Sequence, residues 1–183
     1  MRIIVVRHAS TSYNANHLIN GQHDDPLSSQ GLKELPELVN KLKAYDFTLI
    51  YSSPLKRALK TAEAISGARD LAINIDPRLK EVNFGSFTSQ NWDSMKEIFG
   101  LDSRALLDTY DYDLTEYGGE SSSQVKKRVQ NFLNDLPKKS DQNLLIVTHG
   151  GIIRWLYLLC ANQKTSVHPN SSIHIFNLNA KAL

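Results

Sequence analysis

Three short apolar runs without polar alternation are the sequence feature that most restricts the folds that this 183-residue chain can adopt. They lie at Ile3–Val6, Phe47–Tyr51 and Leu144–Thr148. A strand that is apolar on both sides is buried on both sides, which is typical of a parallel sheet with helices above and below it. A shorter run at Leu71–Ile75 and an alternating run at Ser172–Leu178 predict two more strands, the last of them at an edge.

Segments with helical patterns separate these runs. Their expected bounds are Ser28–Ala44, Pro54–Ile65, Ser121–Leu136 and Ile152–Cys160. Ser28 and Ser53 are candidate N-caps, and Pro54 suits the first turn of a helix. Pro36 lies inside the first helix and is expected to bend or delay it. The apolar stripe expected on that helix is Leu32, Leu35, Leu38, Val39 and Leu42. Alternating strands and helices predict an α/β three-layer sandwich, with a mostly parallel central sheet covered by helices on both faces.

The length predicts a single domain over residues 1–183. The stretch from about Val82 to Gly119 breaks the alternation, because it is rich in aromatic and acidic residues and holds no convincing strand. Short helical pieces are expected there at Trp92–Phe99 and Ser103–Tyr110. We therefore expect a crossover or lid insertion at about 82–119 within the one domain.

Charge and hydropathy argue against several kinds of partner. The net charge of +2 and the lack of a dense Lys/Arg cluster argue against nucleic acid and anionic membrane surfaces. No run approaches the ~18 apolar residues of a membrane span, and the opening apolar run is shorter than a signal-peptide core of ~7–15 residues. Cys160 is the one cysteine, so no internal disulfide can form. These features predict a cytoplasmic protein, and they do not predict an oligomeric state.

Polar side chains follow three of the predicted strands. Arg7 and His8 end the first strand, and Arg57 lies on the helix after the second. His149 ends the last one. Ligands bind at the carboxyl ends of strands in open α/β sheets, so we expect these side chains to converge. Guanidinium groups bind phosphate in a forked geometry, and a neutral imidazole is a competent nucleophile. The pattern predicts a phosphoryl-transfer site.

Gly150 and Gly151 follow His149 at an expected helix start, where backbone N–H groups can approach an anionic oxygen. We expect no metal and no cofactor, because arginines beside the site would repel a cation and no H-x-H or H-x₃-H spacing is present. The four remaining histidines are interpreted as surface or loop residues: His17, His23, His168 and His174.

Six segments carry a resemblance to a known family. In chain order they are RHASTSYN, NGQHDDPLSSQG, SSPLKRALKTA, RLKEVNFGSF, GGESSSQVKKRV and THGG. Together they resemble the motifs of the histidine phosphatase superfamily, on its phosphoglycerate mutase-like branch, and the likeness runs nearly end to end. The resemblance implies the phosphoglycerate mutase-like fold. We expect a small phosphorylated metabolite as substrate, and the sequence leaves open sugar phosphates, phosphoglycerates, nucleoside-linked phosphates and phosphoproteins.

The same resemblance implies roles for individual residues. His8 would be the nucleophile that forms a phosphohistidine, with Arg7, Arg57 and His149 around the phosphate. Glu81 would be the general acid and base. Gly150 would offer a backbone contact to phosphate. The further contacts to phosphate or substrate implied by the resemblance are Asn14, Thr11, Asn20 and Gly21.

Two positions depart from the family's pattern. Ala9 stands where a glycine is usual, and Ser10 where a polar residue, often glutamate, is usual. If the turn needs a positive φ, alanine would cost about 1 kcal/mol or shift the loop. A non-catalytic phosphate-binding relative therefore stays open as an alternative.

Hydrolysis of a phosphomonoester is the expected reaction, and mutase-type phosphoryl transfer is the enzymatic alternative. A mutase must hold a second anionic group of its substrate. Between Ser86 and Gly119 there are two basic residues and seven acidic ones, a balance poorly suited to that task. The DYDLT segment at Asp111–Thr115 matches an aspartate-nucleophile motif, but that motif should follow a buried strand and here follows a predicted helix.

Overall fold

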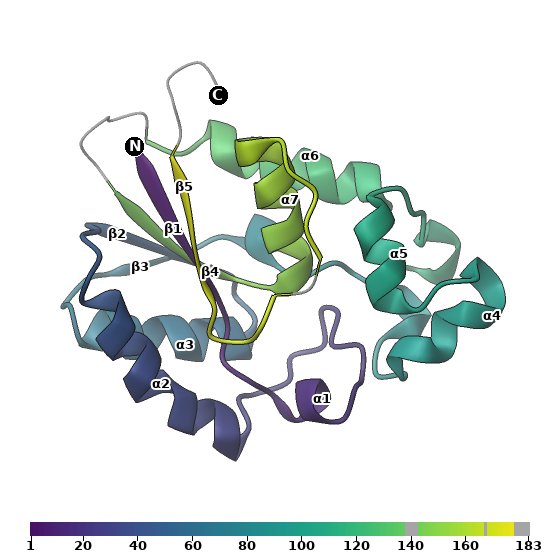
Figure 1. The fold of residues 1–183 in the computed structure, drawn as a ribbon, viewed down its shortest axis with the longest axis horizontal. Coiled ribbons are helices and arrows are strands. Elements are labelled where there is room, and N and C mark those ends of the chain that lie inside the picture. Colours follow the sequence, from purple (N-terminus) through teal and green to yellow (C-terminus); the bar gives the residue numbers. More distant parts are fainter. Residues whose placement is uncertain (138–142, 167, 178–183) are drawn as a thin grey trace.

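The computed structural model describes residues 1–137, 143–166 and 168–177. Its centre is a five-stranded sheet in the order β3-β2-β4-β1-β5 (Figure 1). The strands are β1 (Arg2–Arg7), β2 (Leu49–Ser52), β3 (Ile73–Ile75), β4 (Leu144–Thr148) and β5 (Ile173–Asn177). The first four are parallel, and β5 pairs antiparallel with β1 at the edge. Residue 178, the last of the predicted edge strand, lies outside the described residues.

Helices cover both faces of this sheet. On one face, α2 (Ser29–Leu42) and α3 (Lys56–Gly67) pack against Ile4 and Val6 of β1. On the other, α6 (Ser122–Asn134) and α7 (Gly150–Ala161) pack in the same cluster as Ile3 and Val5. Successive side chains of a strand point to opposite faces, so β1 must be apolar at every one of these positions. The three-layer α/β architecture expected from the sequence is confirmed.

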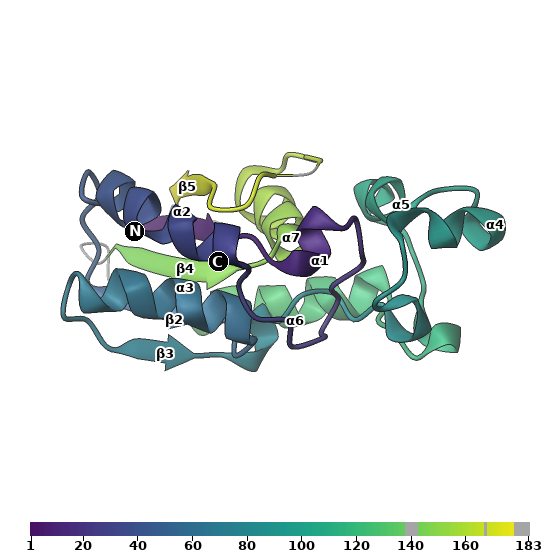
Figure 2. The ribbon, with the colours of Figure 1, turned by 90° about the horizontal axis from the view of Figure 1, so that it is seen from below.

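The insertion at residues 82–119 projects beyond one end of the sheet in two perpendicular views (Figures 1 and 2). It contains α4 (Lys96–Phe99), α5 (Ser103–Thr109) and short 3₁₀ turns at 85–87, 92–95 and 115–117. All of its residues are described, and it forms no strand beyond isolated bridges. Phe87, Phe99 and Tyr117 pack on one another inside it.

Pro36 does not delay α2, which begins directly after its Ser28 cap and continues to Leu42. Pro36 lies on the exposed side, so the Leu32 carbonyl that would otherwise accept its missing N–H can be solvated. Leu32 is itself 49% exposed and does not belong to the buried stripe.

Several element boundaries also differ. The helix α3 begins at Lys56 after a Leu55 cap, two residues later than expected, although the Ser53 hydroxyl accepts the N–H of Leu55 and also contacts the ring of His149. The last helix begins at Gly150, two residues earlier than expected. A short helix that the sequence did not predict, α1 (Ser12–Ala15), follows β1. No helix within the described ranges is long and apolar enough to cross a membrane.

Candidate active site

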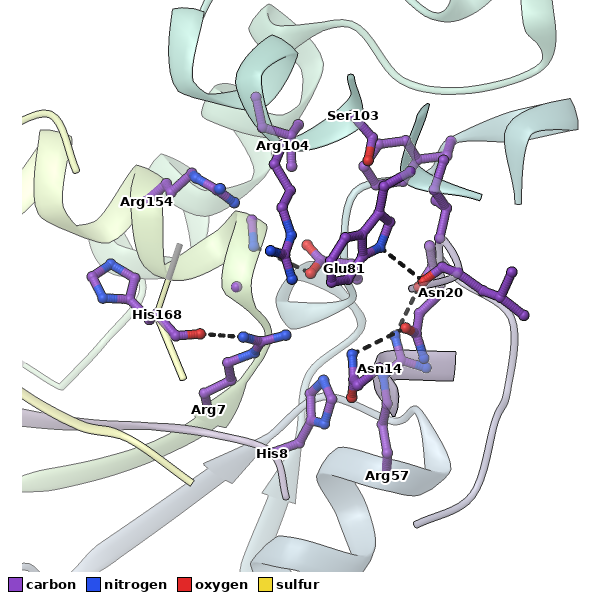
Figure 3. A pocket seen from close by; sticks show the side chains of 18 residues that line it. Arg7, His8, Asn14, Asn20, Arg57, Glu81, Ser103, Arg104, Arg154 and His168 are labelled. Atoms are coloured by element: carbon purple, nitrogen blue, oxygen red, sulfur yellow. Dashed lines mark hydrogen bonds between the residues drawn. The ribbon is translucent and has the colours of Figure 1, made fainter. Parts of the chain in front are cut away.

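A cleft lies at the carboxyl ends of the parallel strands, against the insertion (Figure 3). Eight of the residues expected at the site line this cleft: Arg7, His8, Asn14, Asn20, Gly21, Arg57, Glu81 and Gly150. Thr11 and His149 are fully buried next to it and are not part of its lining. Segments far apart in the sequence thus meet at one place.

His8 is buried with one ring nitrogen fixed. Its Nδ1 lies 2.8 Å from the carbonyl oxygen of Ala9. A carbonyl can only accept, so Nδ1 carries the hydrogen and Nε2 keeps its lone pair. Burial, followed by the charges of Arg57 and Arg7, holds the pKa of His8 well below its ordinary value. The ring is therefore a neutral base at neutral pH, with its free nitrogen available for bonding to phosphorus.

The backbone strain that alanine at position 9 could have caused is absent. Ala9 is fully buried and does not adopt a positive φ. Its N–H donates to the Thr61 hydroxyl at 3.1 Å, and its small side chain fits the interior. Ser10 does not line the cleft, and its N–H donates to the Glu34 carboxylate at 3.1 Å. The two departures from the family's pattern leave the turn after β1 unstrained.

Two guanidinium groups beside His8 are held by backbone carbonyls. Arg57 donates to the carbonyls of His23 at 2.7 Å and Gly21 at 2.8 Å, and Arg7 donates to that of His168. Burial is the main cause that lowers the pKa of each arginine to about 10, so both remain charged at neutral pH. The Nε atoms of both groups have no hydrogen-bond partner among the described residues.

His149 stands behind His8, with the ring centroids 5.0 Å apart. Its Nε2 lies 2.8 Å from the hydroxyl oxygen of Ser53, which also accepts the N–H of Leu55. The Ser53 hydroxyl hydrogen can then point to Nε2, which leaves the hydrogen of His149 on Nδ1. That Nδ1 is buried and has no partner within the described chain. Burial, followed by the charge of Arg57, holds the pKa of His149 well below its ordinary value.

The carboxylate of Glu81 lies at the N-terminus of α7 and accepts a hydrogen bond from it. One oxygen accepts the N–H of Gly151 at 3.1 Å, and the other accepts the N–H of Val82 at 2.9 Å. A negative group at a helix N-terminus is stabilised by the helix dipole. The N–H of Gly151 is therefore used for Glu81 and is not free for a phosphoryl oxygen, contrary to the sequence-based expectation.

Asn14, Asn20 and Thr11 form a small network under the cleft. Thr11 caps α1, and both its N–H and its hydroxyl lie 3.1 Å from the Asn14 side-chain oxygen. Asn20 donates to the Thr11 hydroxyl at 3.0 Å and accepts from Asn14 at 3.2 Å. The bonds of Thr11 are thus used to orient the two asparagines, which do line the cleft.

A segment at residues 168–172 was missed as part of the site. The Asn170 amide donates to the His8 carbonyl at 3.0 Å and to the Asn14 side chain at 3.2 Å. The N–H of Ser171 donates to the Arg7 carbonyl at 3.2 Å. An argument from register could have found it, because antiparallel pairing of β5 with β1 carries the residues before Ile173 past the end of β1.

The interpretation of the four other histidines as surface or loop residues holds for His168, which lies in a loop, and is wrong for His174. His168 lines the cleft, and its carbonyl accepts from Arg7. His174 is a buried residue of β5, 8% exposed, and its ring lies 3.0 Å from the Tyr157 hydroxyl. His17 and His23 have exposed side chains, as expected.

The acidic balance of the insertion does not describe the charges that face the cleft. Arg104 of α5 and Arg154 of α7 both line it, and Glu81 is its one acidic residue among those described. Five of the seven acidic residues of the insertion are exposed, and Asp108 pairs with Arg154. A net count over a segment does not say which side chains face a ligand.

Two other chemistries would need an aspartate nucleophile in the DYDLT segment or a bound metal ion. The prediction that a helix precedes the DYDLT segment is confirmed, because α5 ends at Thr109, and Asp111 and Asp113 are exposed. In the part of the chain that the structure describes, no group of three His, Cys, Asp or Glu side chains is arranged to hold a metal ion.

Comparison with known proteins adds independent findings. A family model described as the histidine phosphatase superfamily (branch 1) matches residues 3–181. A candidate phosphoserine phosphatase of Hydrogenobacter thermophilus is 33% identical over 162 residues, covering 86% of this chain and 77% of that protein. A candidate phosphoglycerate mutase, GpmB of Escherichia coli O1:K1, is 36% identical over 154 residues, covering 82% and 70%.

Solved structures show the same fold. TTHB049 of Thermus thermophilus superposes with a TM-score of 0.77 at 27% identity, covering 96% of this chain and 92% of that one. A mycobacterial glucosyl-3-phosphoglycerate phosphatase superposes with a TM-score of 0.85 at 24% identity, covering 99% and 93%.

Proposed function

Because the chain belongs to the histidine phosphatase superfamily, a family of phosphoryl-transfer and hydrolysis enzymes, we propose that it is a metal-independent phosphomonoester hydrolase acting through a phosphohistidine on His8. The observation that carries this proposal is the environment of His8. Its Nδ1–H is fixed by Ala9, so the lone pair of Nε2 is free, and two charged guanidinium groups lie beside it. Those charges match a phosphoryl group, which carries negative charge on its three equatorial oxygens during transfer.

In the first step, Nε2 of His8 forms a bond to phosphorus while the bond to the leaving oxygen breaks. Arg7 and Arg57 neutralise the phosphoryl oxygens, and Nδ1–H of His149 donates to one of them. The protonated carboxyl of Glu81 gives its proton to the leaving oxygen. In the second step, the Glu81 carboxylate takes a proton from water, whose oxygen bonds to phosphorus as the phosphorus–nitrogen bond breaks. The enzyme is then regenerated and phosphate is released.

The substrate we propose is a small phosphorylated metabolite. The relatives reported above are named for phosphoserine and phosphoglycerate, which supports this class. Mutase-type transfer is the second candidate, and the observation that favours it is the pair of cleft cations beyond the phosphoryl pocket, Arg104 and Arg154. Product analysis separates the two reactions, since a hydrolase releases inorganic phosphate from 3-phosphoglycerate whereas a mutase converts it to 2-phosphoglycerate.

The test is hydrolysis of p-nitrophenyl phosphate in excess chelator, by the wild type and by the His8→Ala variant. We expect turnover to survive the chelator and to fall by at least about 10³-fold in the variant, because the nucleophile is lost. An acid-labile phosphoenzyme should be trapped in the wild type alone. His23→Ala is the matched control, since its ring is exposed and does not line the cleft.

Two results would contradict this proposal. If His8→Ala turns over substrate at the wild-type rate, the phosphohistidine route is wrong. If the wild type binds phosphate but neither turns over nor becomes labelled, the chain is a non-catalytic phosphate-binding relative.

A further inference from the structure

Glu81 lies on a segment of backbone that belongs to no helix or strand. Residues 80–84 follow the short 3₁₀ turn at Pro77–Leu79 and lead into the insertion. Backbone carbonyls outside regular secondary structure need side chains or water as hydrogen-bond donors. The position of Glu81 therefore depends on which side chains bond to the backbone of its own segment.

Arg128 of α6 donates to three carbonyls of this segment. Its Nη1 donates to the carbonyl oxygens of Arg78 at 2.6 Å and of Lys80 at 2.7 Å. Its Nη2 donates to the carbonyl oxygen of Glu81 itself at 3.1 Å. Hydrogen bonds from a charged donor are stronger than those between neutral groups. One guanidinium group thus holds the backbone at Glu81 and at the residues just before it.

The carboxylate of Glu120 orients that guanidinium group. Nε of Arg128 donates to one carboxylate oxygen at 2.8 Å, and Nη2 donates to the other at 3.0 Å. Together with the three carbonyls, these oxygens use every N–H group of the arginine. The second oxygen also accepts the N–H of Asn83 at 2.8 Å. The pair is largely buried, with side chains 16% and 18% exposed, so it contacts the backbone on both sides of Glu81 from a fixed position.

Arg128 acts at a distance from the space that a substrate would occupy. Glu81 lines the cleft, whereas Arg128 does not (Figure 3). Its N–H groups are all bonded to the protein, which leaves none to contact a ligand. An effect of Arg128 on the reaction would therefore pass through the position of Glu81. A small misplacement of a reacting group is enough to slow a reaction strongly.

We propose that Arg128, oriented by Glu120, is a positioning residue that fixes the backbone of Glu81 so that its carboxyl group can protonate the leaving oxygen. The inference rests on the proposed function, in which Glu81 is the general acid. Lysine cannot replace the arginine, because its N–H groups lie on one nitrogen and cannot reach acceptors spread around a planar fork.

The test compares two substrates of similar size that differ in their need for an acid. The p-nitrophenolate of p-nitrophenyl phosphate leaves readily without a proton, whereas the alkoxide of benzyl phosphate must be protonated. The quantity to compare is kcat/KM, which covers the steps up to departure of the leaving oxygen. General acid catalysis contributes about 10²–10⁴-fold. We expect Arg128→Lys to lower the ratio of kcat/KM for benzyl phosphate to that for p-nitrophenyl phosphate by about tenfold or more.

Glu81→Gln is the reference variant, since it removes the proposed acid. It should lower the ratio at least as much as Arg128→Lys does. Adding Arg128→Lys to Glu81→Gln should then leave the ratio unchanged, because no acid remains to be positioned. Lys127→Gln is the matched control: Lys127 is the neighbouring cation of α6 and is exposed, so its ratio should equal that of the wild type.

If Arg128→Lys does not fold, Glu120→Gln decides. This change keeps the shape of the side chain and removes the charge that orients the guanidinium group, so the ratio should again fall. Circular dichroism checks the fold of each variant.

Equal losses for the two substrates in a folded Arg128→Lys would overturn the proposal, because the ion pair would then serve stability alone. If Glu81→Gln lowers the ratio and Arg128→Lys does not, the positioning role is wrong and the proposed function stands. If Glu81→Gln leaves the ratio unchanged, the assignment of Glu81 as the acid fails, and the positioning role fails with it.

Discussion

Gly151 lacks a side chain at a point where the Glu81 carboxylate lies against the backbone of α7. A Cβ added there would overlap that carboxylate and would lie 2.8 Å from a methyl carbon of Val82. Gly150, one residue earlier, has ordinary space, since its Cβ would lie 3.6 Å from the guanidinium carbon of Arg7. The two neighbouring glycines therefore have different tasks, and the second one sets the position of the proposed acid and base.

We predict that Gly151→Ala lowers kcat by about 10²-fold with a smaller change in KM, because a displaced general acid loses its contribution to the transition state. Gly150→Ala keeps the backbone N–H and should cause a much smaller loss. Steady-state kinetics with p-nitrophenyl phosphate, with circular dichroism to check the fold, measures both. Similar losses in the two variants would count against a positioning role of Gly151.

Two arginines that line the cleft, Arg104 and Arg154, could not be placed there from the sequence. Arg7, His8, Arg57 and His149 could be placed because strand ends and helix starts have known relative positions. Arg154 could not, because its position in the cleft depends on the rotation of α7 about its axis. Arg104 depends on the fold of an insertion without strands, whose path is set by side-chain packing such as its stack on Trp92.

The segment at residues 168–172 holds the end of β1 in place through hydrogen bonds. It contacts the side chain and carbonyl of Arg7 and the carbonyl of His8, and it reaches the Asn14 side chain through Asn170. A loop that bonds to backbone on both sides of a nucleophile limits how far that nucleophile can move. We interpret Asn170 as a positioning residue, since it does not line the cleft.

We predict that Asn170→Ala lowers kcat by about tenfold, because the His8 carbonyl and the Asn14 side-chain oxygen each lose one of their donors and the His8 loop loosens. The rate of phosphoenzyme formation in a single turnover is the direct measurement. Asn177→Ala, at the exposed end of β5, is the control and should be unaffected. A wild-type rate of phosphorylation in the Asn170 variant would show that the segment does not position His8.

Buried elements were predictable and their ends were not. The apolar runs of β1 and β4 identify central strands, because only strands covered on both faces lack polar alternation. The helix α3 starts two residues later than predicted, although Ser53 accepts the N–H of Leu55 as a cap would and also bonds to His149 across the site. Pro36 does not interrupt α2, because it lies on the exposed side of the helix, where the carbonyl that it leaves unbonded can be solvated.

For the whole molecule, buried neutral histidines link stability to pH. Burial is the main cause that holds the pKa values of His8 and His149 well below their ordinary value. In the unfolded chain both rings would titrate near about 6.5. Below that pH the unfolded state binds more protons than the folded state, so this contribution to stability is complete above about pH 6.5 and is lost as the pH falls.

We predict that the free energy of unfolding decreases between pH 6.5 and 5.5, by up to about 1.4 kcal/mol per pH unit for each of the two histidines. Urea unfolding in buffer without phosphate or sulfate measures it, since these anions would bind the cleft arginines and hide the effect. His149→Asn should show a shallower slope. Stability that stays constant or rises on acidification over this range would contradict the prediction.

The strand order has a consequence for how the chain is made. The partners of β1 in the sheet are β4 and β5, which begin at Leu144 and Ile173. Ribosomes add roughly 5–20 residues per second, so the apolar side chains of β1 wait on the order of ten seconds for a partner strand. During that time Ile3–Val6 is an unpaired hydrophobic segment of the kind that chaperones bind. The candidate site, whose proposed nucleophile His8 follows β1 directly, can be completed only after β5 has left the ribosome.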